Sequence, residues 1–450
     1  MTPATTSLLS MHEDLKSAVD AAFPSLVAEL SSLVRIPSVS ALDAPEVHRS
    51  AAAVKLLLED SGFSAVRLLE IDGAHPAVYG EIPGPAGAPT VLLYAHHDVQ
   101  PPGPGWTLEP FEPFERDGRL YGRGSADDKA GILMHVGAII AHGGTPPVTV
   151  KVFIEGEEEI GSEHLAQFLD AYGGLLAADV IVIGDSGNWR IGTPALTTSL
   201  RGLVDCTVEV RTLRHAVHSG TFGGVFPDAL MTLSRLLASL HDDRGRVTVP
   251  GLVSGPSPEL DLTEHELRGY ASAVDGLTII GDGNLTSKTW SQPALSVLAI
   301  DAPTVKDAVN ALVPSARAKI SMRLAPGDDP ARAMDALVGH LEQNVPWGAE
   351  VIVTPGASGE AFALDTSGPA YDAFRSAFAE AWDTPPVEMG VGGSIPFVAA
   401  FSESHPGAAI LLTGVADPTS DYHGPDEGVS LDELRRAVIA EAIALRLLAG

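Results

Sequence analysis

Cysteine is nearly absent from this chain of 450 residues, and aromatic residues make up only 6% of it. The one cysteine, Cys206, excludes an intramolecular disulfide and a zinc site built from cysteines. It lies in the alternating stretch from Leu203 to Val208, which is typical of a strand with one buried face. We therefore expect Cys206 to be a small buried strand residue and not a nucleophile.

Positive charge is also scarce, since 28 lysines and arginines stand against 58 acidic residues, a formal net charge of -30. Such a chain repels phosphate backbones and anionic lipids, which argues against nucleic acid and membrane partners. Residues 1–23 lack the charged head and long apolar core of a signal peptide, and no apolar run of about 18 residues is free of charges. A cytoplasmic enzyme is the expected class.

Strands and helices alternate along the first part of the chain. The apolar run 90–94 is typical of a strand buried on both faces, and residues 129–142 have the apolar spacing of a helix. Further strands are expected at 148–154 and 180–183, with a helix at 161–171 between them. This alternation predicts an α/β fold, a mostly parallel sheet with helices on both faces.

The pattern changes near residue 199. Residues 203–213 alternate strictly between apolar and polar, which favours a sheet with one solvated face and a unit of the α+β class. The length also exceeds what a single core usually supports. We predict a catalytic domain in two parts, 1–198 and 357–450, interrupted by an inserted α+β lid or dimerisation domain at 199–356.

Acidic and histidine side chains are concentrated in five short segments, four of which follow a predicted strand or a strand plus loop. The carboxyl ends of parallel strands meet in one crevice of an open α/β sheet. A crevice filled with carboxylates and imidazoles is costly unless cations neutralise it, so the arrangement predicts metal, and metal predicts hydrolysis. The segments are Ala95–Val99, Gly124–Lys129, Glu155–Glu159, Ile183–Asp185 and Tyr422–Glu427.

Each segment has a simpler interpretation when it is taken alone. His96 and Asp98 share one face of an extended chain, so Asp98 can orient His96, but they could also be a surface pair. Asp127 could be an ordinary helix N-cap, and His423 an exposed loop residue. His97 points to the opposite side from His96 and is expected to be structural.

The three glutamates 157–159 could be a solvated acidic run. At a strand end they can instead divide the work, one binding metal while its neighbour accepts a proton from water. The segment Gly184–Gly187 reads Gly-Asp-Ser-Gly, like the nucleophile segment of chymotrypsin-like proteases. We reject that interpretation because the flanking pattern is parallel α/β and no paired cysteines exist.

Taken in order, the motifs of the chain resemble the dinuclear-zinc peptidases that include carnosinase, the cytosolic nonspecific dipeptidase, aminoacylase and carboxypeptidase G. The resemblance runs from about residue 90 to 430 and is closest to the dipeptidase branch. The motifs that carry it are Tyr94–Pro101, Leu120–Lys129, Glu157–Glu163, Leu200–Gly202, Val217–Gly220, Gly392–Pro396 and His423–Glu427.

The resemblance implies two divalent metal ions per subunit, with zinc first and manganese or cobalt as alternatives. His96 and Asp185 would hold one ion, Glu159 and His423 the other, and Asp127 would bridge them. It also implies Glu158 as general base, Asp98 as the residue that orients His96, and a cis peptide bond between Asp127 and Asp128.

The same resemblance implies further residues in and around the inserted domain. That domain would form a homodimer, and His218 would reach the partner's site to stabilise the oxyanion. Arg323 and Ser394 would bind the substrate's carboxylate, and Asn310 is a candidate for the oxyanion region.

The acidic residue at 185 is aspartate, which within the resemblance is more usual in the dipeptidase and aminopeptidase branches. The sequence therefore predicts metal-dependent hydrolysis of short peptides, with dipeptides first, by a metal-activated water and Glu158. One alternative is an N-acyl-amino-acid amidohydrolase that uses the same site. A second alternative is a non-catalytic metal-binding homologue.

Overall fold

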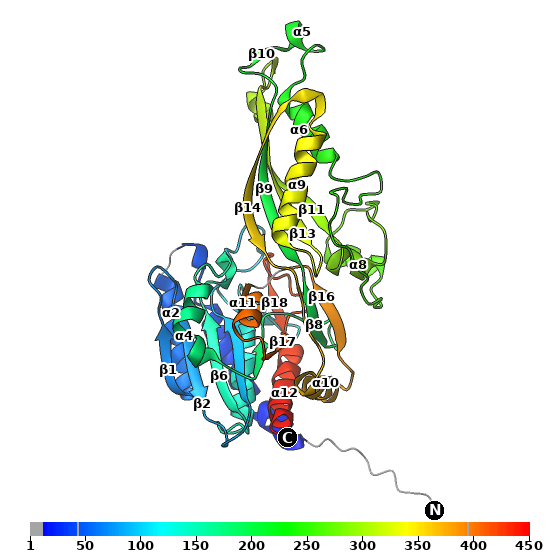
Figure 1. Ribbon diagram of the computed structural model, residues 1–450. Coiled ribbons are helices and arrows are strands. Elements are labelled where there is room, and N and C mark those ends of the chain that lie inside the picture. The colour runs from blue at the N-terminus through cyan, green and yellow to red at the C-terminus, as the bar shows by residue number, and fades with distance from the viewer. Residues whose placement is uncertain (1–11, 43–44, 394–395) are drawn as a thin grey trace, which may run out of the picture. The chain divides into compact units, whose positions relative to one another are not determined.

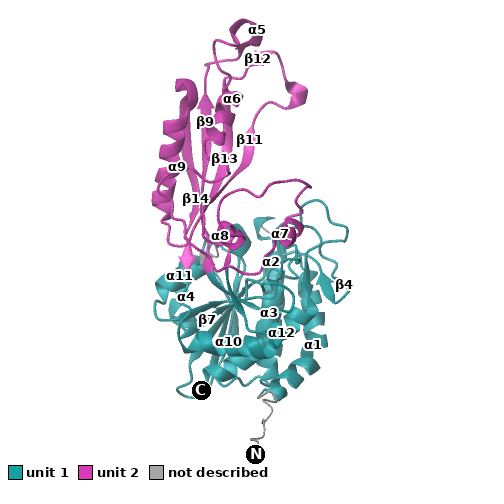
Figure 2. Ribbon diagram, turned by 90° about the vertical axis from the view of Figure 1, so that its right-hand side faces the viewer, with its two compact units in different colours: residues 1–198, 364–389, 396–450 teal, residues 199–363, 390–395 magenta. Residues whose placement is uncertain are grey.

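The computed structural model describes residues 12–42, 45–393 and 396–450. They divide into two compact units, coloured separately in Figure 2. Unit 1 comprises Met1–Thr198, Leu364–Met389 and Pro396–Gly450, and unit 2 comprises Ser199–Ala363 and Gly390–Ile395. The two units are described one after the other.

A mixed sheet of nine strands organises unit 1 (Figure 1). Its four central strands, β6, β3, β7 and β17, are parallel, whereas β1, β2, β8 and β15 pair antiparallel with their neighbours. This confirms the predicted α/β fold with a mostly parallel central sheet. The order is β1 (Ser64–Leu69), β2 (Ala77–Ile82), β6 (Thr149–Glu155), β3 (Thr90–His96), β7 (Val180–Ile183), β17 (Ala409–Leu412), β8 (Ala195–Leu200) and β15 (Phe362–Ala363), and β16 (Val387–Val391) also pairs with β8.

Alternate residues of the central strands enter two different layers. Val91 and Leu93 of β3 belong to one large core, while Tyr94 turns the other way and stacks on Phe397, with ring centroids 3.7 Å apart. Helices therefore cover both faces, as predicted. The first face carries α1 (Glu13–Val34), α2 (Pro45–Asp60), α3 (Lys129–Ala141), α10 (Pro369–Trp382) and α12 (Leu431–Leu448), and the second carries α4 (Leu165–Leu176) and α11 (Pro396–Ser404).

Helix α1 is, among the described residues, the one helix long and apolar enough to cross a membrane, with a mean hydropathy of 1.2 over its best window. Its buried residues, Leu26, Leu30 and Val34 among them, belong to the core that α3 and α12 also build. In this fold the apolar stripe of α1 serves core packing.

A small second sheet of unit 1 joins distant parts of the chain. Strand β5 (Arg119–Tyr121) pairs with β4 (Phe114–Arg116) on one side and with β18 (Gly428–Ser430) on the other. Each strand has only three residues, too few to show an alternating pattern, so the sequence gives no sign of them. Their pairing places the segment after β5 beside the segment before β18.

Unit 2 contains a four-stranded antiparallel sheet covered by two helices. Residues of β9 alternate between buried and partly exposed, and Cys206 is fully buried among them, as predicted. The sheet order is β11 (Ala294–Asp301), β13 (Ser315–Leu324), β9 (Gly202–Arg211) and β14 (Glu350–Gly359), with helices α6 (Ala229–Ala238) and α9 (Pro330–Asn344) packed on it. The remaining elements of unit 2 are β10 (Val217–His218), α5 (Ser219–Phe222), α7 (Glu264–Tyr270), α8 (Leu285–Trp290), β12 (Ala311–Leu312) and the short 3-10 helices η3 (Val305–Asp307) and η4 (Pro346–Gly348). The 3-10 helix η1 (Ser40–Leu42) belongs to unit 1.

One predicted helix is displaced. The pattern predicted a helix over 161–171, but α4 begins at Leu165. The acidic segment first forms the 3-10 helix η2 (Glu158–Ile160), which ends at Gly161 in the left-handed region with φ 89°. A glycine with this φ ends a helical turn, so the chain must reverse before α4 can start.

Gly137 lets α3 approach its neighbours closely. A β-carbon there would lie 2.7 Å from a methyl group of Val438 and 2.8 Å from one of Leu26. We expect Gly137→Leu to lower the free energy of unfolding by about 1–3 kcal/mol through overpacking. Gly173 in α4 is the control, since nothing lies within 4 Å of its β-carbon position. Gly173→Leu should stabilise by about 0.5–1 kcal/mol. Urea unfolding measures both, and equal effects would contradict this account of the α3 contact.

Candidate metal centre

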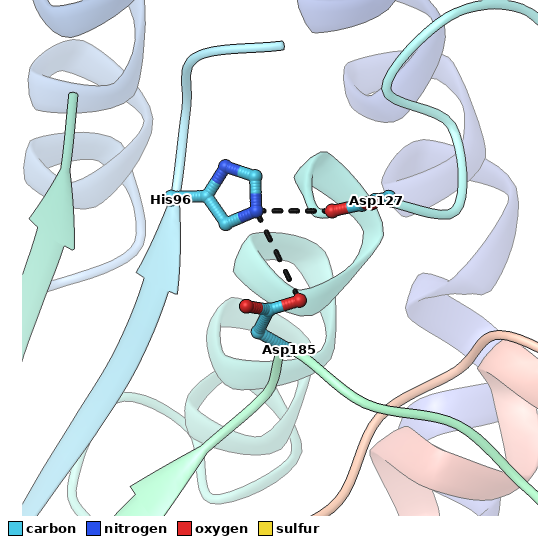
Figure 3. Close-up of side chains that lie close together, drawn as sticks. All are labelled: His96, Asp127 and Asp185. Carbon is cyan, nitrogen blue, oxygen red and sulfur yellow. Dashed lines mark hydrogen bonds and ion pairs between the residues drawn. The ribbon is translucent and has the colours of Figure 1, made fainter. Parts of the chain in front are cut away.

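Three side chains meet at the carboxyl end of the parallel strands (Figure 3). His96 is the last residue of β3, Asp185 follows β7, and Asp127 lies just before α3. His96 Nε2 is 3.0 Å from Asp127 Oδ1 and 3.9 Å from Asp185 Oδ1. Parallel strands bring their carboxyl ends to one edge, which is why residues so far apart in sequence converge here.

A second group shares Asp127 with the first. His423 Nε2 is 3.1 Å from Asp127 Oδ2 and 3.2 Å from Glu159 Oε2. In each group of three, one nitrogen or oxygen atom per residue lies within 4.8 Å of those of the other two. Asp127 therefore presents one carboxylate oxygen to each group, which is the arrangement required of a bridging ligand.

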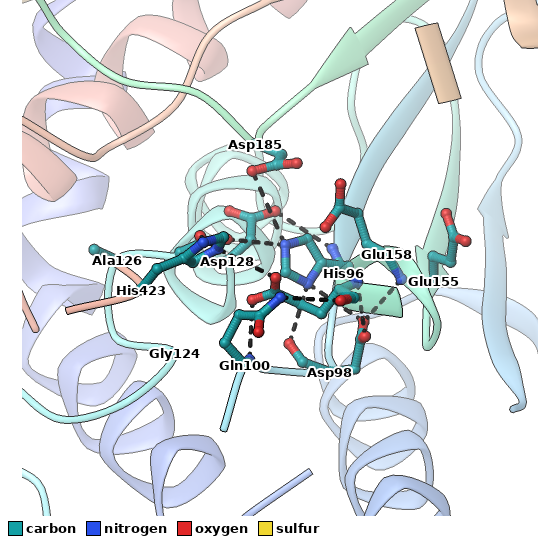
Figure 4. A network of polar contacts seen from close by, with 12 residues as sticks. His96, Asp98, Gln100, Gly124, Ala126, Asp128, Glu155, Glu158, Asp185 and His423 are labelled. Carbon is teal, nitrogen blue, oxygen red and sulfur yellow. Dashed lines mark hydrogen bonds and ion pairs between the residues drawn. The ribbon is translucent and has the colours of Figure 1, made fainter. Parts of the chain in front are cut away.

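The three consecutive glutamates have different surroundings, and Figure 4 shows Glu158 near His96 and Asp185. Glu157 is buried and accepts hydrogen bonds from the backbone N–H of His75 at 2.8 Å and from Nδ1 of His164 at 2.9 Å. Glu159 accepts one from the backbone N–H of Gln100 at 3.1 Å and faces His423. Glu158 lies between them on η2. Glu157 thus anchors the turn, which leaves the next two carboxylates at the metal centre.

Burial dominates the titration of Glu158. It raises the pKa of this carboxyl group to about 8, and the negative charges of Glu159 and Asp127 add to the rise while His96 opposes it. Burial and the charge of Glu158 likewise raise the pKa of Asp185 well above its usual range. A carboxyl group with a pKa near neutrality can accept and return a proton at physiological pH.

Asp98 holds several parts of the site together. Its two oxygens accept hydrogen bonds from the backbone N–H groups of Glu158 and Glu159, at 3.2 and 3.0 Å. One of the same oxygens is 3.4 Å from Nδ1 of His96, and the backbone carbonyl of Asp98 is 3.1 Å from that nitrogen. A carboxylate behind a ligating imidazole fixes its tautomer and orientation.

Further carboxylates lie close by. Asp128 stands at the N-cap position of α3 but makes no side-chain cap; its Oδ2 instead accepts from the backbone N–H of His96 at 3.3 Å. Burial raises the pKa of Asp128 to about 7. The peptide bond between Asp127 and Asp128 is cis. In the two groups of three, His96 and His423 stand with the carboxylates of Asp127, Asp185 and Glu159, a donor set that fits divalent cations of the kind that histidine and carboxylate ligate.

The oxyanion and substrate-binding candidates that the structure describes belong to unit 2. His218 of β10 and Asn310, which directly precedes β12, are exposed residues of unit 2, and the backbone N–H of Ser219 donates to the carbonyl of Asn310 at 3.1 Å. Arg323 is a partly exposed residue of β13, also in unit 2. Ser394 lies outside the described residues. His97 is buried and contacts the carbonyl of Pro76 through Nε2 at 2.9 Å.

Two buried residues carried no role in the sequence interpretation, Glu427 beside the Asp127 segment and Arg201 in unit 2. Glu427 is fully buried and accepts from backbone N–H groups on both sides of Ala126. Arg201 is 6% exposed, and burial together with the charge of Arg323 lowers its pKa to about 10. Both stand in the motifs that carried the family resemblance, but sequence spacing alone does not reveal their burial.

The family model for peptidase family M20/M25/M40 matches residues 92–446. The chain belongs to this family and is a metal-dependent peptidase, so the predicted resemblance is confirmed. The residues of both three-residue groups lie within the matched range.

Three similar proteins are dipeptidases by name. The chain is 37% identical over 426 residues to cysteinylglycine-S-conjugate dipeptidase of Corynebacterium striatum, covering 92% of this chain and 93% of that protein. It is similar in structure to human carnosine dipeptidase 1, with a TM-score of 0.82 and 25% identity over 97% of this chain and 98% of the other. A dipeptidase of Saccharomyces cerevisiae shares the fold, with a TM-score of 0.82, 22% identity and coverage of 97% and 98%.

The buried carboxyl groups predict how stability depends on pH. Glu158 and Asp128 have pKa values of about 8 and 7, well above those of exposed carboxyl groups. The folded protein therefore keeps protons that the unfolded chain has lost, so the metal-free protein should become less stable as pH rises from about 5 to 8.

Divalent cations should replace those protons. Thermal unfolding with a chelator and with excess Mn²⁺ or Zn²⁺ tests this, and the cation should raise the melting temperature more at pH 8 than at pH 6. A metal-free melting temperature that rises with pH, or an equal metal effect at both pH values, would contradict the expectation.

Proposed function

We propose that this protein hydrolyses dipeptides with two divalent metal ions, zinc or manganese first. The observation that carries the proposal is the sharing of Asp127 between two three-residue ligand groups, with Glu158 beside both. His96, Asp127 and Asp185 would hold one ion. Asp127, Glu159 and His423 would hold the other.

Bound ions would polarise the scissile carbonyl and acidify a water molecule. Oε1 or Oε2 of Glu158 would take the proton from that water and later give it to the leaving amine. The raised pKa of Glu158 supports both transfers, because a base that is too weakly basic would not accept the proton. General acid–base help of this kind is worth about 10²–10⁴-fold in rate.

Asp98 would keep the geometry of the reaction. Its hydrogen bonds to the backbone of Glu158 and Glu159 fix both glutamates with respect to His96. The metal-binding and proton-transfer groups therefore share one anchor. A shift of Asp98 would therefore displace the proposed ligand Glu159 and the proposed base Glu158 together.

Unit 2 would supply the groups that bind the substrate. The side chain of Arg323 has no hydrogen bond or ion pair with another described residue, so its guanidinium is available to bind a peptide carboxylate. We retain His218 as the oxyanion-stabilising residue, Asn310 as its neighbour and Ser394 as a second carboxylate ligand. We also retain the homodimer formed through the inserted domain, residues 199–356, and a cytoplasmic location as parts of the proposal.

The relatives make dipeptides the first substrates to test. Purified protein should be stripped of metal, reloaded with Zn²⁺ or Mn²⁺ and assayed on a dipeptide panel that includes cysteinylglycine and β-alanylhistidine. N-acetyl amino acids run in parallel test the amidohydrolase alternative. We expect turnover of free dipeptides and little of acetylated amino acids. The reverse preference would establish the amidohydrolase instead, and no turnover of any dipeptide by metal-loaded protein would overturn the proposed substrate class.

Glu158→Gln tests the base. Glutamine keeps the size of the side chain and cannot accept a proton, so kcat should fall by at least about 10²-fold while both metals stay bound. Metal content by mass spectrometry and kcat on the best dipeptide measure this. Glu157→Gln is the control, because Glu157 anchors the turn through His75 and His164. A Glu158→Gln variant that retained its activity would remove Glu158 from the mechanism.

A further inference from the structure

Glu427 has a buried carboxylate whose hydrogen-bonding capacity is almost fully used. Oε1 accepts from the backbone N–H groups of Ala126 at 2.8 Å and Asp127 at 3.1 Å. Oε2 accepts from the backbone N–H of Gly124 at 3.0 Å and from the guanidinium of Arg123 at 2.6 Å. The side chain is 0% exposed, so these donors replace water completely.

The backbone around Glu427 makes the connection rigid. The N–H of Gly122 donates to the carbonyl of Glu427 at 2.8 Å, directly beside the pairing of β5 with β18. Arg123 also donates to the carbonyl of Gly424, three residues before Glu427 in the chain, at 3.2 Å. Gly124 has φ 82°, and a β-carbon there would lie 2.6 Å from Val99, so the turn that aims its N–H at Glu427 requires glycine.

These bonds join the segment that ends in Asp127 to the segment that begins with His423. Both residues belong to the same proposed metal group, with Asp127 Oδ2 3.1 Å from His423 Nε2. His96 and Asp185 reach their places differently, from the ends of β3 and β7. We propose that Glu427, with Arg123, is a positioning residue that sets the separation of Asp127 and His423 and so determines the affinity of the Asp127–Glu159–His423 group for its metal.

The chemistry of the pair supports a positioning role. A buried arginine–glutamate pair adds little net stability over apolar residues of the same size, because both charges lose their hydration. A carboxylate that accepts hydrogen bonds from several N–H groups of one loop holds the backbone of that loop in place, because each hydrogen bond has a direction that apolar packing lacks. Residues behind metal ligands orient them, and their loss typically weakens metal binding by about 10–100-fold.

Glu433 provides a matched control in the same part of the chain. It is also 0% exposed and accepts from Nδ2 of Asn188 at 2.8 Å, the N–H of Gly192 at 2.9 Å and Nε1 of Trp382 at 3.0 Å. It contacts none of the proposed metal ligands. Glu433→Gln therefore disturbs a buried carboxylate of similar type without touching the Asp127 or His423 segments.

The inference rests on the proposed function and is tested by metal binding alone. Calorimetric titration of the metal-free protein with Zn²⁺ should show two binding events, and His423→Ala identifies the one that belongs to the second group. Glu427→Gln turns an amide N–H₂ toward backbone N–H groups, so we expect that same event to weaken by about 10–100-fold, and the other event to weaken less. Arg123→Lys, which cannot reach Glu427 and Gly424 together, should act in the same direction and serves if Glu427→Gln does not fold.

The controls separate the outcomes. Glu433→Gln should lower the melting temperature of the metal-free protein and leave both affinities unchanged. A folded Glu427→Gln or Arg123→Lys protein with wild-type affinities overturns the positioning role, as does equal weakening in Glu433→Gln. If wild-type protein and the variants all bind two metals with equal affinity, the positioning role is overturned and the proposed function stands. If wild-type protein binds no metal, the positioning role and the proposed function are both overturned.

Discussion

Repulsion between buried carboxylates is the constraint on which this structure depends. The carboxylates of unit 1 meet this repulsion in two ways. The carboxylates that anchor loops, Asp98, Glu157 and Glu427, accept hydrogen bonds from backbone N–H groups, which are neutral and fixed in place. Those that face the centre, Asp127, Asp185 and Glu158, lack such anchoring, and their excess charge is what makes the site a receptor for cations.

Much of this could be predicted from the sequence, since the physical signals are local. The apolar run 90–94 appears as β3, and the segments after β3, β6 and β7 carry acids or histidine because strand ends in a parallel sheet must converge. The residues His96, Asp127, Glu159, Asp185 and His423 do come together in the structure, although sequence spacing could only suggest it. The family resemblance, now confirmed, supplied the pairing of ligands that spacing does not contain.

What could not be predicted depends on long-range contacts or on very short elements. Strands β5 and β18 have three residues each, and their pairing exists only because distant segments meet. Glu427 follows His423 by four residues and received no role from the sequence, because nothing in its local pattern shows that it is fully buried. The start of α4 was misplaced because the acidic segment forms η2 and needs Gly161 to reverse direction. In each case tertiary contacts decide the conformation.

The pairing of β5 with β18 also affects the order in which the protein matures. During synthesis the ribosome releases His96, Asp127, Glu159 and Asp185 long before His423 emerges, so a nascent chain offers all three donors of the first group early but lacks His423 of the second. Strand β18 must pair with β5 before Glu427 can accept hydrogen bonds from the loop that ends in Asp127. Under the proposed two-metal function, metal acquired during synthesis would bind the His96–Asp127–Asp185 group first, and binding at the Asp127–Glu159–His423 group would require the late segment to have docked.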